Sequence, residues 1–151
     1  SRPPSGDILA IERIKAIHQR LPNTHLVMHG SSSVPQELLQ EINAHGGDIA
    51  ETYGVPVEEL QQGLKHGVRK VNIDTDLRLA STASIRKFLA ANPSEFDPRK
   101  YLAVSQQAMK DVVVARYQAF GTAGHADKIQ SKSLESMFMQ YAAGDLAPQI
   151  A

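Results

Sequence analysis

The hydrophobic positions of this chain follow two alternating patterns. Apolar residues recur at helical spacing over residues 8–21, and Asp7 before them is a candidate N-cap. The short apolar run HLVMH, residues 25–29, is typical of a strand that is buried on both faces. The run VRKVNID, residues 68–74, predicts a second strand.

Helical patterns fill most of the remaining chain, and proline and glycine mark their ends. Pro35 and Pro56 stand where two helices are expected to begin. Gly46 and Gly47 follow one of these helices, and Gly67 is the expected C-cap of the other. The predicted helices cover residues 8–21, 35–47, 55–67, 75–92, 98–120 and 133–143.

Strands that alternate with helices indicate βαβ units, so the predicted fold class is α/β with a parallel sheet. Two strands cannot build a parallel sheet that is covered on both faces, so we expect the end of an α/β fold rather than a complete one. The opening SRPPSG reads as a loop entering a helix and has no initiator methionine. This start indicates a chain that begins inside something larger.

Composition narrows the classes of function. The chain has 151 residues, enough for one domain with a core, and its 16 basic and 16 acidic residues give a formal net charge of zero. That balance argues against polyanion binding through bulk charge. The absence of cysteine excludes disulfides, thiolate metal sites and a cysteine nucleophile, and it fits a cytosolic protein. No apolar run approaches the roughly 20 residues of a membrane span, and the start is not a signal peptide.

A histidine, a glycine and three serines follow the first predicted strand. Ligands of α/β folds bind at the C-terminal ends of strands, where His29 is expected to lie. Gly30 lets a ligand approach the backbone, and Ser31, Ser32 and Ser33 offer hydroxyl and N–H groups. His29 is therefore a candidate metal ligand beside an anion cradle. The alternative, of equal weight, is a histidine that is hydrogen-bonded into place at a strand end.

A second polar cluster, Asn72, Asp74, Thr75 and Asp76, follows the second predicted strand and leads directly into a helix. The free N–H groups and dipole of a helix N-terminus favour a phosphate there. The alternative is that Asp74 or Thr75 caps the helix without any ligand. Asn72 and Asp74 are expected to point to the same side of the strand. Two successive strands that end in such loops resemble the phosphate site of a (β/α)8 barrel, which the loops after its last two strands build.

The remaining charged and imidazole side chains carry weaker signals. Arg116 lies inside an apolar helical pattern. There it either extends its charged end to solvent or binds a phosphate with two of its guanidinium nitrogens. Arg78 and Arg86 are expected to be solvated. The other histidines lack the spacing of metal ligands and are expected to be structural. They are His18, His25, His45, His66 and His125.

Three segments together resemble one enzyme family. LVMHGSSSVPQ, GVRKVNIDTDLRLA and the opening RPPSGDILAIERI resemble class II, metal-dependent fructose-1,6-bisphosphate aldolases, and the region after Asn92 resembles their Calvin-cycle-type branch. The resemblance implies a (β/α)8 barrel with its strands seven and eight at about 25–29 and 68–73. Residues 1–92 are then the C-terminal part of the barrel, and residues 93–151 are a helical C-terminal extension.

The resemblance also implies roles for individual residues. His29 would be one ligand of a catalytic Zn²⁺, a Lewis acid for the enediolate that aldol cleavage leaves; a second divalent or a monovalent cation is a further candidate. The two polar segments would bind dihydroxyacetone phosphate, and Arg116 would hold the other phosphate of the bisphosphate. The implied substrate-binding residues are Gly30, Ser31, Ser32, Asn72, Ile73, Asp74, Thr75 and Arg116.

Other parts of the family's catalytic machinery have no counterpart in this chain. The acid–base aspartate and the remaining zinc ligands lie on earlier strands, so no catalytic residue is expected here and the chain alone is expected to be inactive. The implied whole is a cytoplasmic lyase that reversibly cleaves fructose 1,6-bisphosphate to dihydroxyacetone phosphate and glyceraldehyde 3-phosphate, in glycolysis, gluconeogenesis or the Calvin cycle. Its expected partners are sugar phosphates, the missing N-terminal barrel half and further copies in a dimer or tetramer, with no nucleic acid and no membrane.

Two other functions stay open. Tagatose-bisphosphate aldolase shares the mechanism, although the NIDTD stretch is more similar to fructose-type enzymes. A non-catalytic phosphate-binding or oligomerisation module would explain the missing zinc ligands. That second alternative leaves His29 unexplained, because a phosphate cradle alone needs no zinc-ready histidine.

Overall fold

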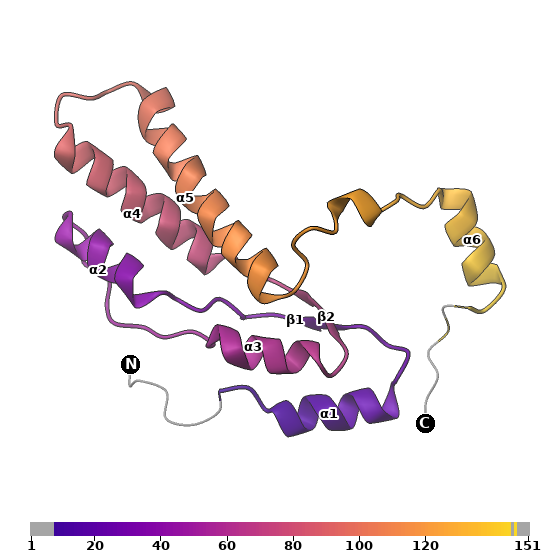
Figure 1. Cartoon of the computed structure of the whole chain (residues 1–151). Coiled ribbons are helices and arrows are strands. Elements are labelled where there is room, and N and C mark those ends of the chain that lie inside the picture. The colour runs from indigo at the N-terminus through magenta and orange to yellow at the C-terminus, as the bar shows by residue number, and fades with distance from the viewer. Residues whose placement is uncertain (1–7, 146, 148–151) are drawn as a thin grey trace.

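Figure 1 shows the computed structural model of the chain, which describes residues 8–145 and 147. Helices and strands alternate in the predicted order, and a small parallel sheet lies among the helices. The helices are α1 (Ile11–Arg20), α2 (Gln36–Ala44), α3 (Val57–Leu64), α4 (Thr75–Ala91), α5 (Pro98–Ala119) and α6 (Leu134–Ala142), with a short 3₁₀ helix η1 (Ala126–Lys128). The strands are β1 (Leu26–Met28) and β2 (Val68–Val71).

The two strands pair in parallel, and the chain crosses from β1 to β2 through α2 and α3. This confirms the predicted α/β class. Both strands are shorter than predicted. β2 ends at Val71, and although the N–H of Asn72 still donates to the carbonyl of Met28 at 3.0 Å, Asp74 already occupies the N-cap position of α4. The expectation that Asn72 and Asp74 share one side of a strand is therefore wrong, because neither lies in the strand.

The helix boundaries follow most of the sequence signals. Pro35 and Pro56 are the N-cap residues of α2 and α3, and Gly46 takes a left-handed φ of 82° directly after the C-cap of α2. Gly67 is not the C-cap of α3 as predicted. The C-cap is Lys65, and Gly67 turns the chain into β2 with a φ of 86°. The predicted cap Asp7 lies outside the described residues, and the N-cap of α1 is Ala10.

Two groups of buried apolar side chains form the core. One lies between α2 and α4 and comprises Val34, Leu39, Ile42, Leu79 and Ala83. The other lies between the sheet and α3 and comprises Met28, Val55, Leu60 and Val68. The loop that leaves β1 connects the two groups, because it starts beside Met28 and ends with Val34 inside the first group.

Helices α4 and α5 pack side by side as a long hairpin that rises from the sheet (Figure 1). The hydroxyls of Ser81 and Ser105 meet across this hairpin at 2.7 Å. At its turn, Asp97 caps α5 by accepting from the N–H of Arg99, and Pro98 occupies the first helical turn. The predicted helix over residues 98–120 is thus confirmed.

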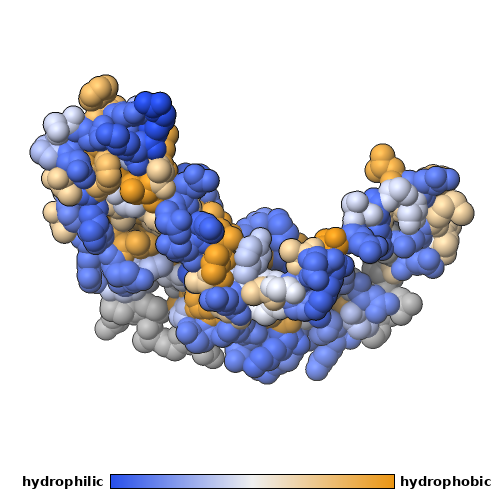
Figure 2. Space-filling model, turned by 45° about the horizontal axis from the view of Figure 1, so that its top comes forward, coloured by the Kyte–Doolittle hydropathy of each residue, from blue (hydrophilic) through white to orange (hydrophobic). Residues whose placement is uncertain are grey.

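Residues 121–136 are all exposed and lead to α6, which stands away from the body across a broad hollow (Figure 2). Its apolar side chains Leu134, Phe138 and Tyr141 face solvent. Among the described residues, no helix is both long and apolar enough to cross a membrane.

Candidate functional site

The loop after β1 is built from small residues held in fixed positions. Gly30 has a φ of 64°, and a Cβ at this position would meet no other atom within 4 Å, so the backbone here is open to a ligand. Ser31 is buried, and its hydroxyl donates to the carbonyl of His29 at 3.2 Å. The carbonyl of Ser32 accepts from the N–H of Val55 at 3.0 Å, and a Cβ at Gly54 would collide with that carbonyl. The segment after α2 therefore presses against this loop.

The two predicted polar segments meet at the N-terminus of α4. The Oγ atom of Ser32 accepts hydrogen bonds from the backbone N–H groups of Asp74 at 3.3 Å and Thr75 at 3.1 Å. Asp74 stands at the N-cap position, but its side chain makes no capping bond and instead accepts from Nε of Arg78 at 2.9 Å. The loop of one strand thus caps the helix that follows the other strand. Of the predicted alternatives Asp74 and Thr75, Asp74 is the N-cap residue, although its side chain makes no capping bond.

His29 lies at the same edge of the sheet and contacts Asn72. The Nδ2 of Asn72 is 3.0 Å from Nδ1 of His29, and the Oδ1 of Asn72 accepts from Nζ of Lys70 at 2.8 Å. Because Lys70 fixes the oxygen of the amide, the Asn72 NH₂ group faces the imidazole, where Nδ2 also lies 3.4 Å from Nε2 of His29. His29 and Asn72 are both predicted site residues, and the structure brings them together.

Imidazole is a ligand that zinc binds readily, but a zinc site needs at least three protein ligands. Within residues 8–145, no group of three or more histidine, aspartate or glutamate side chains could hold a metal ion. His29 has the amide of Asn72 as its side-chain neighbour rather than a carboxylate or a second imidazole. The described residues therefore supply one candidate ligand and do not form a complete zinc site.

Arg116 reaches the same region from α5, although the partners differ from both predicted alternatives. Its Nη2 donates to Oγ of Ser33 at 2.6 Å and to Oδ2 of Asp76 at 3.0 Å, while its buried Nε has no partner. Arg116 also borders a pocket of about 400 Å³ that Ser33, Gln36 and Tyr53 help to line. Arg116 thus contacts the loop after β1 and a buried carboxylate. Its predicted contact with a phosphate stays a prediction.

Ile73 is half-buried on the other side of the α4 N-terminus. It borders a groove of about 330 Å³ between β2 and α5, which Val112 and Tyr117 also line. Its side chain therefore belongs to an apolar surface, and only its backbone belongs to the polar segment 72–75.

Two other predictions on charged residues can be compared with the structure. Nδ1 of His45 contacts the carbonyl of Glu41 at 2.8 Å and its carboxylate at 3.1 Å, which fits a structural role at a helix end. Arg78 is solvated as predicted, although it pairs with Asp74.

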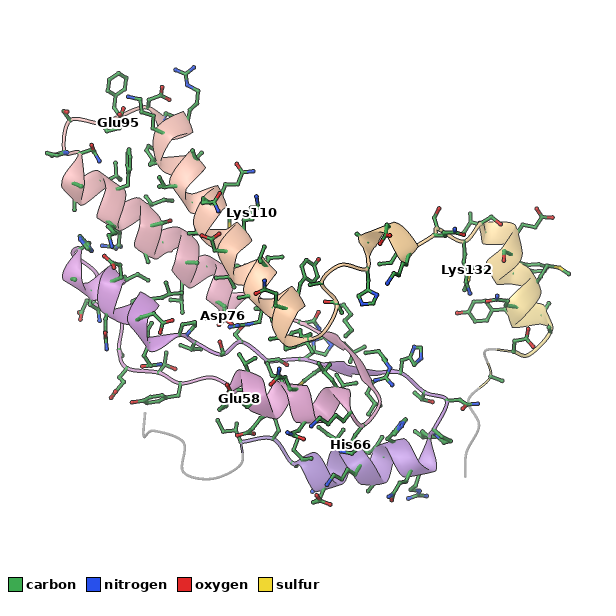
Figure 3. The ribbon with its side chains drawn as sticks, viewed as in Figure 1. Glu58, His66, Asp76, Glu95, Lys110 and Lys132 are labelled. Carbon is green, nitrogen blue, oxygen red and sulfur yellow. The ribbon has the colours of Figure 1, made fainter. Side chains whose placement is uncertain are left out.

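Sequence reasoning placed Asp76 in the second polar cluster but did not predict that it connects these parts. Asp76 is fully buried at the start of α4 (Figure 3) and binds the loop after β1 through Ser33 and Val34. Its place in the NIDTD stretch was a signal, since it extends the polar cluster by one residue into an amphipathic helix. The left-handed backbone of Val34, with a φ of 52°, has no sequence signal, because valine rarely adopts that conformation.

Comparisons with known proteins point to one family. Residues 2–125 match the family described as "Fructose-bisphosphate aldolase class-II". The chain is 68% identical over 150 residues to a fructose-bisphosphate aldolase of Stutzerimonas stutzeri and 66% identical over 150 residues to one of Pseudomonas aeruginosa. Both alignments cover 99% of this chain. A fructose-bisphosphate aldolase of Xanthobacter flavus is 65% identical over 147 residues, which cover 97% of the chain.

The chain spans about 42% of the length of these relatives. The family match covers more than half of the chain and includes β1, β2 and both polar segments. The chain belongs to the class II fructose-bisphosphate aldolase family.

Proposed function

We propose that this chain carries the phosphate-binding half of a zinc-dependent fructose-1,6-bisphosphate aldolase. In this proposal β1 and β2 are strands seven and eight of a (β/α)8 barrel, and the rest of the barrel lies outside the chain. The observation that carries the proposal is the meeting of Ser32 with the N-terminus of α4. Two loops after adjacent parallel strands place a hydroxyl, a free glycine backbone and helix N–H groups at one point, which is the arrangement that binds a phosphate.

The proposed substrate contacts follow from this geometry. The phosphate of dihydroxyacetone phosphate binds beside Gly30 and accepts from the hydroxyl of Ser32, which itself accepts from the N–H groups of Asp74 and Thr75, where the helix dipole favours negative charge. Ser31 supports the loop from inside, because its hydroxyl is directed to the carbonyl of His29. Binding at this point holds the ketose chain at the edge of the sheet where His29 lies, which is the positioning that aldol cleavage needs.

His29 is the zinc ligand that we assign to this chain, and the other ligands and the acid–base aspartate come from the missing part of the barrel. The amide of Asn72 lies against the imidazole and restricts its orientation. We include Ile73 for its backbone position alone. Arg116 is retained as a candidate for the second phosphate, although its present partners, Ser33 and Asp76, favour a role inside the loop.

The finer assignments belong to the same proposal. The whole protein is a cytoplasmic homo-oligomer of the Calvin-cycle-type branch. In this chain the barrel part ends at residue 92, and a helical extension follows it. That boundary runs through the turn of the α4–α5 hairpin, whose helices pack together. The hairpin therefore joins the barrel part to the extension.

The test compares variants of the full-length protein that contains this sequence. We expect His29→Ala to lose bound zinc and to cleave fructose 1,6-bisphosphate only at the background rate. A catalytic zinc site has three protein ligands, and the loss of one removes the metal. His125→Ala is the matched control, since His125 is exposed beyond the hairpin, and it should keep both properties. Retention of zinc and cleavage by His29→Ala would contradict the proposal. Phosphate binding without zinc or cleavage in the unmodified protein would instead support a non-catalytic module, and faster cleavage of tagatose 1,6-bisphosphate would support the other aldolase.

A further inference from the structure

The loop that carries Ser32 ends in a strained residue. Val34 has a φ of 52°, and it is the one described residue other than glycine with a positive φ. In this left-handed region the Cβ of an L-residue crowds the backbone, and the crowding is worse for a β-branched side chain. Val34 is also buried against α2 and α4, so solvent cannot relax it. Such a conformation persists only where the surroundings impose it.

One buried carboxylate imposes it. Oδ1 of Asp76 accepts from the N–H of Val34 at 2.8 Å, and Oδ2 accepts from the N–H of Ser33 at 3.0 Å. Oδ2 also accepts from the hydroxyl of Ser33 at 3.0 Å. Asp76 therefore binds two successive N–H groups of the loop, and this pairing fixes the direction of the peptide between Ser33 and Val34.

A cation from a third element balances this charge. Asp76 is fully buried, and an isolated carboxylate in that position would be costly. Arg116, with 17% of its side chain exposed, ion-pairs with Oδ2 of Asp76 at 3.0 Å and donates to the hydroxyl of Ser33 at 2.6 Å. We call Ser33, Val34, Asp76 and Arg116 the Asp76 cluster. It joins the loop after β1, the start of α4 and the last turns of α5.

We propose that Asp76 and Arg116 are positioning residues for the phosphate site. They hold Val34 in its left-handed conformation and thereby fix Ser32, two residues earlier, against the N–H groups of Asp74 and Thr75. The phosphate then meets a site that is formed before it arrives. The inference rests on the proposed function, because the site in question is the phosphate site assigned above.

The position of the cluster supports a positioning role. An ion pair that only stabilised the core would not need to lie next to the phosphate site. Asp76 lies one residue after Thr75 on α4, and Ser33 lies one residue after Ser32 on the loop. Ser32 and Thr75, which meet in the cap, therefore each have a direct chain neighbour inside the cluster. A shift of the cluster moves both sides of the phosphate site at once.

The experiment measures KM for fructose 1,6-bisphosphate, kcat, and Kd for dihydroxyacetone phosphate in the full-length protein that contains this sequence. We expect Asp76→Asn to raise KM and Kd about tenfold with kcat within about twofold, because binding loses preorganisation while the chemistry stays intact. Asp127→Asn, an exposed carboxylate in η1, is the matched control and should match the unmodified protein. Unchanged KM and Kd in a folded Asp76→Asn variant would overturn the inference.

A second variant tests the route through Val34. Glycine accepts a φ of 52° without strain, so Val34→Gly in the Asp76→Asn background should restore at least half of the lost affinity on a logarithmic scale. Independent, additive effects of the two substitutions would show that Asp76 does not act through Val34 and would overturn that step.

A third variant, Arg116→Lys, tests the cluster by itself if Asp76→Asn fails to fold. Combined with Asp76→Asn, it separates positioning by Arg116 from direct contact with substrate. Arg116→Lys keeps the charge but loses the planar fork, and we expect it to raise KM a few-fold. In the Asp76→Asn background the same change should have no further effect, whereas a full additional effect would show direct contact and overturn the positioning role of Arg116. If the unmodified protein neither binds dihydroxyacetone phosphate nor cleaves the bisphosphate, the proposed function itself fails.

Discussion

The chain contains two aspartate–arginine pairs in opposite surroundings. Asp76 and Arg116 meet at 3.0 Å with 0% and 17% of their side chains exposed, at the base of the hairpin. Asp97 and Arg99 meet at 2.6 Å with 20% and 88% exposed, at its turn beside Glu95 (Figure 3). The shorter pair is the more solvated one, so distance alone does not indicate which pair matters. The buried pair also binds loop backbone, whereas the exposed pair joins residues two apart.

The largest expected effect tests the buried pair. Asp76→Ala leaves the Arg116 charge and two loop N–H groups without their partner, so we expect a loss of about 3–5 kcal/mol in the free energy of unfolding. Urea unfolding followed by circular dichroism measures it. Asp111→Ala, an exposed aspartate in α5, is the control and should change stability by less than about 0.5 kcal/mol. A similar loss of unfolding free energy in Asp76→Ala and Asp111→Ala would show that burial does not distinguish these aspartates.

An intermediate effect is expected where Ser32, next to the Asp76 cluster, caps α4. Ser32→Ala removes the hydroxyl that caps α4, so we expect a loss of about 1 kcal/mol in the free energy of unfolding. The same substitution should weaken binding of dihydroxyacetone phosphate, measured by calorimetry. Ser136→Ala on the exposed α6 should leave that binding unchanged. Equal binding by Ser32→Ala and the unmodified protein would exclude Ser32 from the phosphate site.

The stability contribution of the carboxylates at the hairpin turn, Glu95 and Asp97, should depend on pH. The hydrogen bond from Lys100 lowers the pKa of Glu95, and the hydrogen bond from Arg99 lowers the pKa of Asp97. Because both folded pKa values lie below the unfolded ones, the ionised carboxylates stabilise the fold above about pH 4, and this contribution is lost as pH falls through the folded values. Unfolding curves of the unmodified protein and the double variant Glu95→Gln, Asp97→Asn should therefore converge in acid. Curves that stay equally far apart at every pH would contradict this.

The smallest effect is expected from Arg99→Gln. The guanidinium is almost wholly exposed, so solvent screens its attraction to Asp97 and the substitution should leave the urea midpoint nearly unchanged. Any difference should disappear at 1 M salt, where screening acts over about 3 Å. A large decrease of the urea midpoint that persists at 1 M salt would show that the Asp97–Arg99 pair is not merely a solvated ion pair.

The sequence predicted those parts of the fold that depend on local periodicity and on glycine and proline. The parallel strands, the long helices and the helix starts at Pro35 and Pro56 were predicted in this way. The strand ends were less accurate, because Ile73 extends the apolar pattern of β2 although residues 72–74 supply the entry to α4. In the site, the two polar segments were predicted because each follows a buried strand. The Asp76 cluster was not, since its partners are 40 or more residues apart and none forms a periodic pattern.

The hydroxyl of Ser32 also bears on how readily the site empties. It gives the N–H groups at the start of α4 a partner within the chain when no anion is present. An arriving phosphate therefore accepts from the O–H of Ser32 and leaves these hydrogen bonds in place, so binding adds one hydrogen bond at this point. A helix end that keeps its own resting partner therefore binds an anion reversibly.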